Sequence, residues 1–158
     1  MNRIVVLFFI FSHGILCSQT TDWVKSFGGE ASDKGISIGA DSLGFIYVSG
    51  YFNNEATFGN ITLTNSPLST TGNNKENFVF KIDSNGNVLW AIAGGNLSGG
   101  CCDDRALGMH VTPGGDVFIT GTFWSSYNLG PLSVPGNQQN AHDNSLLAKI
   151  DKDGNPQW

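Results

Sequence analysis

Trp23-Val24-Lys25-Ser26-Phe27-Gly28-Gly29 returns at an offset of 67 as Trp90-Ala91-Ile92-Ala93-Gly94-Gly95, and Trp158 follows Trp90 at an offset of 68. The same succession of turn residues and apolar runs follows each of the first two segments. A constant period of this length is typical of proteins built from repeated units, each of which buries its apolar face against a neighbour. The repeat therefore predicts the architecture, although it does not identify a ligand.

Further matches fix the extent of the units. Three residues recur at an offset of 71: Asp33, Gly44 and Gly50 correspond to Asp104, Gly115 and Gly121. The run 80–87 recurs as 148–155 at an offset of 68, and four extra residues at 98–102 lie before Asp104. We therefore expect a first unit over residues 19–90 and a second over residues 91–158.

Each unit is expected to contain four main strands, because short aromatic and β-branched runs alternate with turn residues. The strands predicted for the first unit are 35–41, 45–52, 77–82 and 87–92, with a short hairpin at 57–63. Those predicted for the second are 106–112, 116–123, 132–134 and 146–150. The turns between them contain Asp, Asn and Gly. The predicted fold class is all-β: two four-stranded antiparallel blades of a β-propeller, in an incomplete ring, with Trp23 and Trp90 over the blade interface.

One pattern covers nearly the whole mature chain. It runs Trp-x-x-x-x-Gly-Gly, then Ile-x-x-Asp-x-x-Gly-x-Ile-Tyr-Val-x-Gly-x-Phe, then Ala-Thr-Phe-Gly, then Phe-Val-x-Lys-Ile-Asp-x-x-Gly-Asn-x-x-Trp. This pattern resembles the bacterial β-propeller repeat (SBBP-type) family, and the first unit is the closer match. The resemblance implies a multi-blade exported or cell-surface protein of the Bacteroidetes type, of which this chain is an N-terminal fragment with two repeats. It implies no chemistry.

The N-terminal segment that precedes Gln19 differs from the repeats. Arg3 precedes an apolar run, Ile4–Leu16, that is too short and too interrupted to span a membrane. We expect a signal peptide over residues 1–18, cleaved between Ser18 and Gln19, and a secreted or outer cell-surface location; a retained anchor is the alternative. The formal net charge of −5, without a basic run, argues against nucleic acid and anionic membranes as partners.

Two acidic turns are weak candidates for calcium. Asp83 and Asn85 lie in one, and Asp151 and Asp153 in the other, each next to a Gly that permits a tight bend around a cation. A full calcium loop also needs a Glu six residues after the Gly, and Ile92 stands there instead. The alternative is a turn in which the Asp side chain caps the backbone. We therefore predict no cofactor and leave calcium as the exception.

The adjacent cysteines Cys101 and Cys102 lie in the insertion of the second unit. In an oxidising compartment they could form a disulfide with each other, pair between chains, or remain exposed thiols. A zinc site would need further ligands, and His110 and His142 are at no recognisable spacing. We expect a local disulfide or free thiols without metal.

Aromatic residues after the second strand of each unit are candidates for stacking on a sugar: Tyr51, Trp124 and Tyr127. The alternative is packing between blades. No nucleophile or phosphate-binding motif is present, and neighbouring Asp103 and Asp104 would point to opposite faces of a strand. We therefore expect a non-catalytic scaffold that binds a protein or glycan and contacts further blades, without membrane insertion. The alternative is the N-terminal part of a larger propeller enzyme, a glycosidase or lyase, with its catalytic residues elsewhere.

Overall fold

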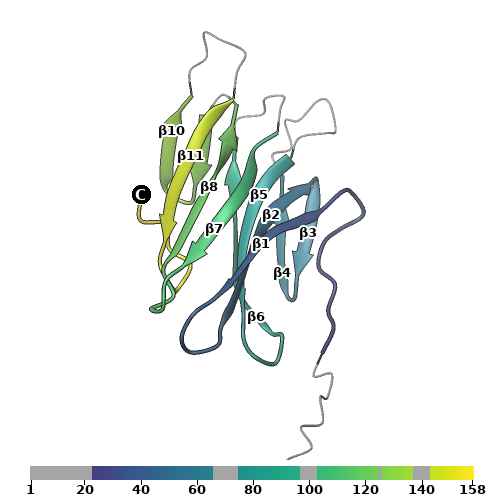
Figure 1. Ribbon diagram of the computed structural model, residues 1–158. Coiled ribbons are helices and arrows are strands. Elements are labelled where there is room, and N and C mark those ends of the chain that lie inside the picture. The colour runs from purple at the N-terminus through teal and green to yellow at the C-terminus, as the bar shows by residue number, and fades with distance from the viewer. Residues whose placement is uncertain (1–22, 66–74, 97–102, 125, 137–142) are drawn as a thin grey trace, which may run out of the picture.

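The computed structural model describes residues 23–65, 75–96, 103–124, 126–136 and 143–158 (Figure 1). These residues form eleven strands and no helix. The strands are β1 (Lys34–Ala40), β2 (Ile46–Asn53), β3 (Glu55–Phe58), β4 (Ile61–Thr64), β5 (Lys75–Ile82), β6 (Val88–Gly95), β7 (Arg105–Val111), β8 (Val117–Phe123), β9 (Ser126–Leu129), β10 (Leu132–Pro135) and β11 (Asn144–Ile150). The all-β prediction is confirmed for this part of the chain, and no described helix is long and apolar enough to cross a membrane.

In the structure, unit one denotes the antiparallel meander of β1, β2, β5 and β6 with the hairpin β3–β4, and unit two denotes β7 to β11. The turn between β1 and β2 shows why the chain reverses there. One carboxylate oxygen of Asp41 accepts the backbone N–H groups of Leu43 and Phe45, at 2.9 and 3.1 Å. Gly44 takes a φ of 84°, which a side chain would disfavour. Asp83 and Gly86 form the turn between β5 and β6 in the same way.

A short hairpin lies between the second and third meander strands of each unit. It is β3–β4 in unit one and β9–β10 in unit two. The hairpin pairs with the segment that precedes its own unit: Gly28 bridges Thr57, and Gly95 pairs with Asn128. Because these two pairs are equivalent in the repeat, the hairpin is the recurring link between successive units.

Unit two contributes a three-stranded sheet in the order β11-β8-β7, and residues 156–158 begin to pair with β11. The backbone N–H of Lys149 donates to Trp158 O at 2.8 Å, as Lys81 pairs with Trp90 in unit one. The described residues thus form sheets of six, three and two strands, not the two four-stranded sheets that we predicted. The main reason is that β9–β10 joins the edge of β6 and extends the first sheet.

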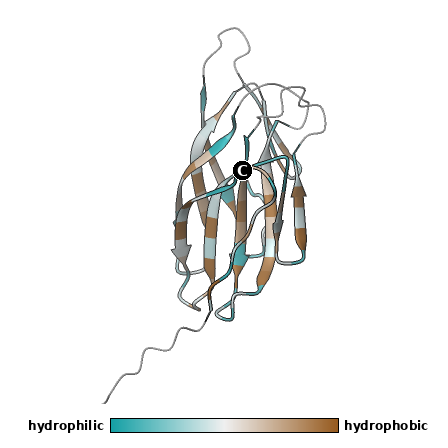
Figure 2. Ribbon diagram, turned by 90° about the vertical axis from the view of Figure 1, so that its right-hand side faces the viewer, coloured by the Kyte–Doolittle hydropathy of each residue, from teal (hydrophilic) through white to brown (hydrophobic). Residues whose placement is uncertain are grey.

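Two apolar clusters lie on the two faces of unit one. The cluster between the units contains Tyr47 and Val79 from unit one with Ile119, Leu146 and Ile150 from unit two. The second cluster, on the opposite face, is aromatic and is covered by Trp23, Phe27 and the β3–β4 hairpin. In Figure 2, brown hydrophobic bands recur along the strands between paler and teal residues, as a period of two requires.

Trp23 and Trp90, which begin the two repeats of the sequence, occupy equivalent positions in the structure. Trp23 lies on the turn that follows β5, and Trp90 lies on the turn that follows β11. Trp23 Nε1 donates to Ser84 O at 2.8 Å, and Trp90 Nε1 donates to Lys152 O at 3.1 Å. The Trp90 ring also meets Tyr47 edge-on, with centroids 6.0 Å apart. Trp90 therefore joins the two units.

Candidate functional site

A cluster of aromatic and charged side chains lies where β2 ends and β5 and β7 begin. This loop-end cluster consists of Tyr51, Lys75, Asp103 and Arg105. Lys75 Nζ lies 2.9 Å from Asp103 Oδ2, and the Arg105 guanidinium contacts the same carboxylate oxygen. Lys75 Nζ lies 5.5 Å from the Tyr51 ring centroid and Arg105 Cζ 5.9 Å from it, so both cations are within cation–π range.

The cluster joins the two units and remains accessible. Tyr51 and Lys75 come from unit one, whereas Asp103 and Arg105 come from unit two, and all four side chains are partly buried. Burial acts to raise the pKa of Asp103, but the hydrogen bonds and charges of Lys75 and Arg105 outweigh it and hold that pKa below its usual value. Asp103 is thus a charged hydrogen-bond acceptor, and the cluster combines an aromatic ring with ionic groups.

Asp104, next to this cluster, is a structural carboxylate. It is buried, and its two oxygens accept the backbone N–H groups of Asn96 at 2.8 Å and Trp124 at 3.0 Å. Asp33, its equivalent, accepts the N–H groups of Gly29 and Asn53. Burial raises the pKa of Asp104 to about 6. A carboxylate whose two oxygens hold two chain segments in place is poorly placed to exchange protons with a substrate.

The three predicted stacking residues have different surroundings. Tyr51 belongs to the loop-end cluster. Trp124 is half-buried, and its backbone accepts a hydrogen bond from Asn144 Nδ2 at 2.7 Å. Tyr127 is buried, its hydroxyl donates to Asn77 Oδ1 at 2.9 Å, and burial raises its pKa well above the usual value. The structure corrects our expectation for Tyr127, because its ring fills the core between the units.

The two acidic turns lie at the opposite ends of β5 and β11 from the loop-end cluster. Asp83 accepts the backbone N–H groups of Asn85 and Asn87 at 2.9 and 2.8 Å, and the Asn87 bonds are the main reason that its pKa is lowered. Asp151 accepts those of Asp153 and Asn155 at 3.0 and 2.9 Å. These bonds are the turn geometry that we considered as the alternative to calcium. Within the described ranges, no group of three or more His, Cys, Asp and Glu residues could hold a metal.

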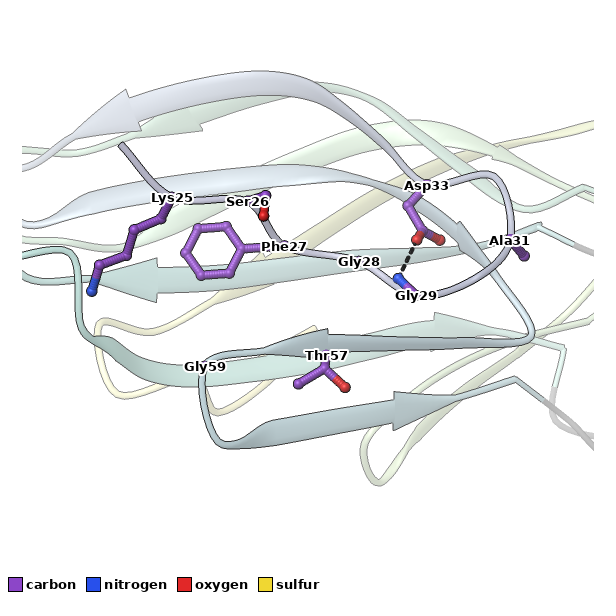
Figure 3. Close-up of a pocket in the computed structure, with 9 residues that line it drawn as sticks. All are labelled: Lys25, Ser26, Phe27, Gly28, Gly29, Ala31, Asp33, Thr57 and Gly59. Atoms are coloured by element: carbon purple, nitrogen blue, oxygen red, sulfur yellow. Dashed lines mark hydrogen bonds between the residues drawn. The ribbon is translucent and has the colours of Figure 1, made fainter. Parts of the chain in front are cut away.

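An open groove of about 690 Å³ runs along residues 25–29 and β3 (Figure 3). Its two charged side chains, Lys25 and Asp33, already hold backbone groups. Lys25 Nζ donates to Gly86 O at 2.7 Å, and Asp33 holds the N–H of Gly29. The groove therefore offers a ligand little convergent polar chemistry.

Four other predicted residues, Ser18, Gln19, Cys101 and Cys102, lie outside the described residues. Lys75 and Arg105 belong to no motif of the sequence and were not predicted. They are far apart in the sequence and meet only because β7 packs beside β2, a contact for which the sequence carries no local signal.

Part of the chain matches a known protein-family model. No curated protein matches the chain. A protein-family model, SBBP, described as a beta-propeller repeat, matches residues 22–54. This match runs from the segment before β1 to the end of β2, and it supports the resemblance that the sequence pattern indicates. We conclude that residues 22–54 are similar to the beta-propeller repeat of the SBBP family.

Proposed function

We propose that this chain is a non-catalytic β-propeller segment, secreted or displayed on the outer cell surface, which binds a protein or glycan through its loop-end cluster. The observation that carries the proposal is the position of Tyr51 beside two cations that share one carboxylate, at the seam of two units. Aromatic rings beside charged hydrogen-bonding groups are a common means of holding polar ligands.

The contacts between the units support the propeller part of the proposal. Each unit is proposed to act as one blade, in which the meander forms the blade and the hairpin links it to the preceding one. The links Gly28–Thr57 and Gly95–Asn128 recur, as do the two Trp hydrogen bonds to the following turn. Recurrence of this kind is what a radial array requires, and further blades of a longer parent protein are proposed partners.

The described carboxylates at the loop end support binding rather than acid–base catalysis. Asp103 is held in two ion pairs, and both oxygens of Asp104 hold backbone N–H groups. General acid–base chemistry needs a group that can reach a substrate proton. The expected role of the loop-end cluster is therefore to orient a ligand.

A printed glycan array probed with the labelled full chain tests the binding site. We expect at least one glycan to bind, and Tyr51→Ala to weaken that binding about tenfold, which corresponds to about 1.4 kcal/mol. Leu43→Ala is the matched control, because Leu43 is an exposed apolar residue on a turn at the other end of β2. An array without binding, or equal binding by Tyr51→Ala, would contradict the glycan proposal.

The location is tested separately by N-terminal sequencing of the protein recovered from a bacterial culture. A mature chain that begins at Gln19, in the medium or on the outer surface, is the expected result. A cytoplasmic chain that retains Met1 or its neighbours would overturn the proposed location without affecting the glycan test.

A further inference from the structure

Buried polar atoms that lack a protein partner gather around Tyr51. Among the described residues, four atoms next to this tyrosine are buried and have no hydrogen-bond partner: Ser49 Oγ, Asn53 Oδ1, Asn77 Nδ2 and Arg105 Nε. Ser49 is 0% exposed and Asn77 is 1% exposed. A buried polar group without a partner is costly, and a bound water or ligand group is the usual means of satisfying it.

The pairing of the strands places these atoms on one face of the sheet. Ser49, Tyr51 and Asn53 alternate along β2, so their side chains point to the same side. Asn77 pairs directly with Tyr51 across β5, which puts their Cβ atoms about 4.5–5.5 Å apart. Arg105 approaches from unit two, with its Cζ 5.9 Å from the Tyr51 ring centroid. The site is thus enclosed between two units that are both present.

The four atoms form a mixed set of donors and acceptors. Asn77 Nδ2 and Arg105 Nε donate, whereas Asn53 Oδ1 accepts, and the hydroxyl of Ser49 can do both. A carboxylate or phosphate only accepts hydrogen bonds, and an ammonium group only donates them. A hydroxyl group donates one and accepts two, so a ligand rich in hydroxyl groups matches this set.

The charges around the site favour a neutral ligand. Lys75 and Arg105 already pair with Asp103, whose pKa is held below its usual value. Burial, and after it the negative charges of Asp103 and Asp143, raise the pKa of Asp104, so several carboxyl groups lie close together here. An anionic ligand would meet these groups without finding a free cation among the side chains of the loop-end cluster.

We propose that the ligand of the loop-end cluster is a neutral saccharide that packs against Tyr51 and whose hydroxyl groups bind the buried polar atoms around it. This inference rests on the proposed function, to which it adds the class of glycan and the further contact residues. Tyr51 and Lys75 are only partly buried, and they alternate with the buried polar residues on the same face. Rotation of these two side chains would admit the hydroxyl groups, because rotamers of accessible side chains change rapidly.

Isothermal titration calorimetry of the full chain tests the inference with hexamers of glucose, mannose, N-acetylglucosamine and galacturonate. We expect at least one neutral hexamer to bind more tightly than the anionic galacturonate hexamer. Ser49→Ala should weaken this binding about tenfold, as expected for the loss of one hydrogen bond to the ligand. Its Tm should equal or exceed that of the wild type, because the hydroxyl that is removed has no partner in the protein.

A second variant and a control separate binding from structure. Asn53→Leu, of similar volume, should also weaken binding while the chain stays folded. Ser133→Ala is the matched control, since Ser133 is an exposed serine on β10 outside the site, and it should bind as the wild type does.

The outcomes distinguish this inference from the proposed function. Binding that Tyr51→Ala weakens, but that Ser49→Ala and Asn53→Leu leave unchanged, would overturn the inference and leave the proposed function standing. Tighter binding of galacturonate than of every neutral hexamer would also overturn it. Absence of binding by all the hexamers would overturn the inference as well, and the glycan array would then decide the proposed function separately.

Discussion

Gly50 and Gly121 show how a single residue type preserves the form of the repeat. A Cβ on Gly50 would lie 1.9 Å from the carbonyl oxygen of Lys34, and one on Gly121 would lie 1.9 Å from that of Arg105. Register shifts next to both contacts bring the neighbouring strand inward, between Gly35 and Ser37 and between Ala106 and Gly108. The close approach of two backbones leaves no room for a side chain.

We expect Gly50→Ala to destabilise the fold by about 3 kcal/mol or more, because the added methyl group forces the strands β1 and β2 apart. Gly35→Ala, on the paired strand, is the control. A Cβ there would meet only Val48 Cγ1, at 3.7 Å, so its effect should stay within about 0.5 kcal/mol. Urea unfolding of both variants measures the difference, and equal stability of the two would contradict this account of the glycine.

The raised pKa of Asp104 predicts that the free energy of unfolding depends on pH. Its pKa is about 6 in the folded chain against an ordinary value of 3.8. The folded state therefore binds the proton more tightly than the unfolded state does. The resulting stabilisation of the folded state is complete below about pH 4 and is lost as the pH rises to about 6. A difference of about two pKa units corresponds to about 3 kcal/mol.

The measurement compares the wild-type chain with Asp104→Asn by urea unfolding between pH 4 and pH 7. The wild-type free energy of unfolding should fall more steeply from pH 4 to pH 6 than that of the variant, which cannot titrate at this position. Parallel curves for the two proteins would show that Asp104 does not titrate in this range.

At the scale of elements, the link between hairpin and preceding strand is conserved in geometry but not in residues. In unit one, Phe27 packs on the cluster that contains buried Ala56. In unit two, the equivalents are Gly94 and Tyr127, and a Cβ on Gly94 would lie 2.2 Å from the Tyr127 hydroxyl. The large side chain comes from the segment before the unit in unit one, where it is Phe27, and from the hairpin in unit two, where it is Tyr127, so the link is filled in two ways of similar volume.

This exchange of size can be tested by a double-mutant cycle in unit two. Tyr127→Ala should cost about 3–5 kcal/mol because it leaves a cavity, and Gly94→Phe should be destabilising because its side chain meets Tyr127. The double variant should be more stable than the sum of the two single effects predicts, by about 1–3 kcal/mol. Additive effects, measured by urea unfolding, would mean that the two positions do not share one space.

The pairing of the second hairpin with β6 shows where prediction from the sequence fails. Most strands and turns followed from local patterns, such as Asp41 to Gly44 between two apolar runs. Strand β9 was not predicted, because Tyr127-Asn128-Leu129 lacks the pattern of Ala56-Thr57-Phe58. Its pairing with β6, and with it the burial of Tyr127, depends on Gly94, which lies far from the hairpin in the sequence. Non-local complementarity of this kind has no signature in a short window of sequence.

For the whole molecule, the distribution of apolar surface is uneven. The cluster between the units is closed, whereas Ile38 on one outer face and Leu147 on the other are exposed. Arrays of repeats gain much of their stability from the interfaces between units, so an array with two open faces lacks part of it. The further blades proposed as partners would cover these faces.

The closed interface should therefore supply much of the stability of the described fold. Val79 is 1% exposed in the cluster between the units, whereas Leu147, at the same repeat position in unit two, is 62% exposed. We expect Val79→Ala to lower the free energy of unfolding by about 2 kcal/mol, because it leaves a cavity between the units, and Leu147→Ala to change it by no more than about 0.5 kcal/mol. Urea unfolding of both variants measures the difference, and equal effects would contradict a stabilising role for the interface.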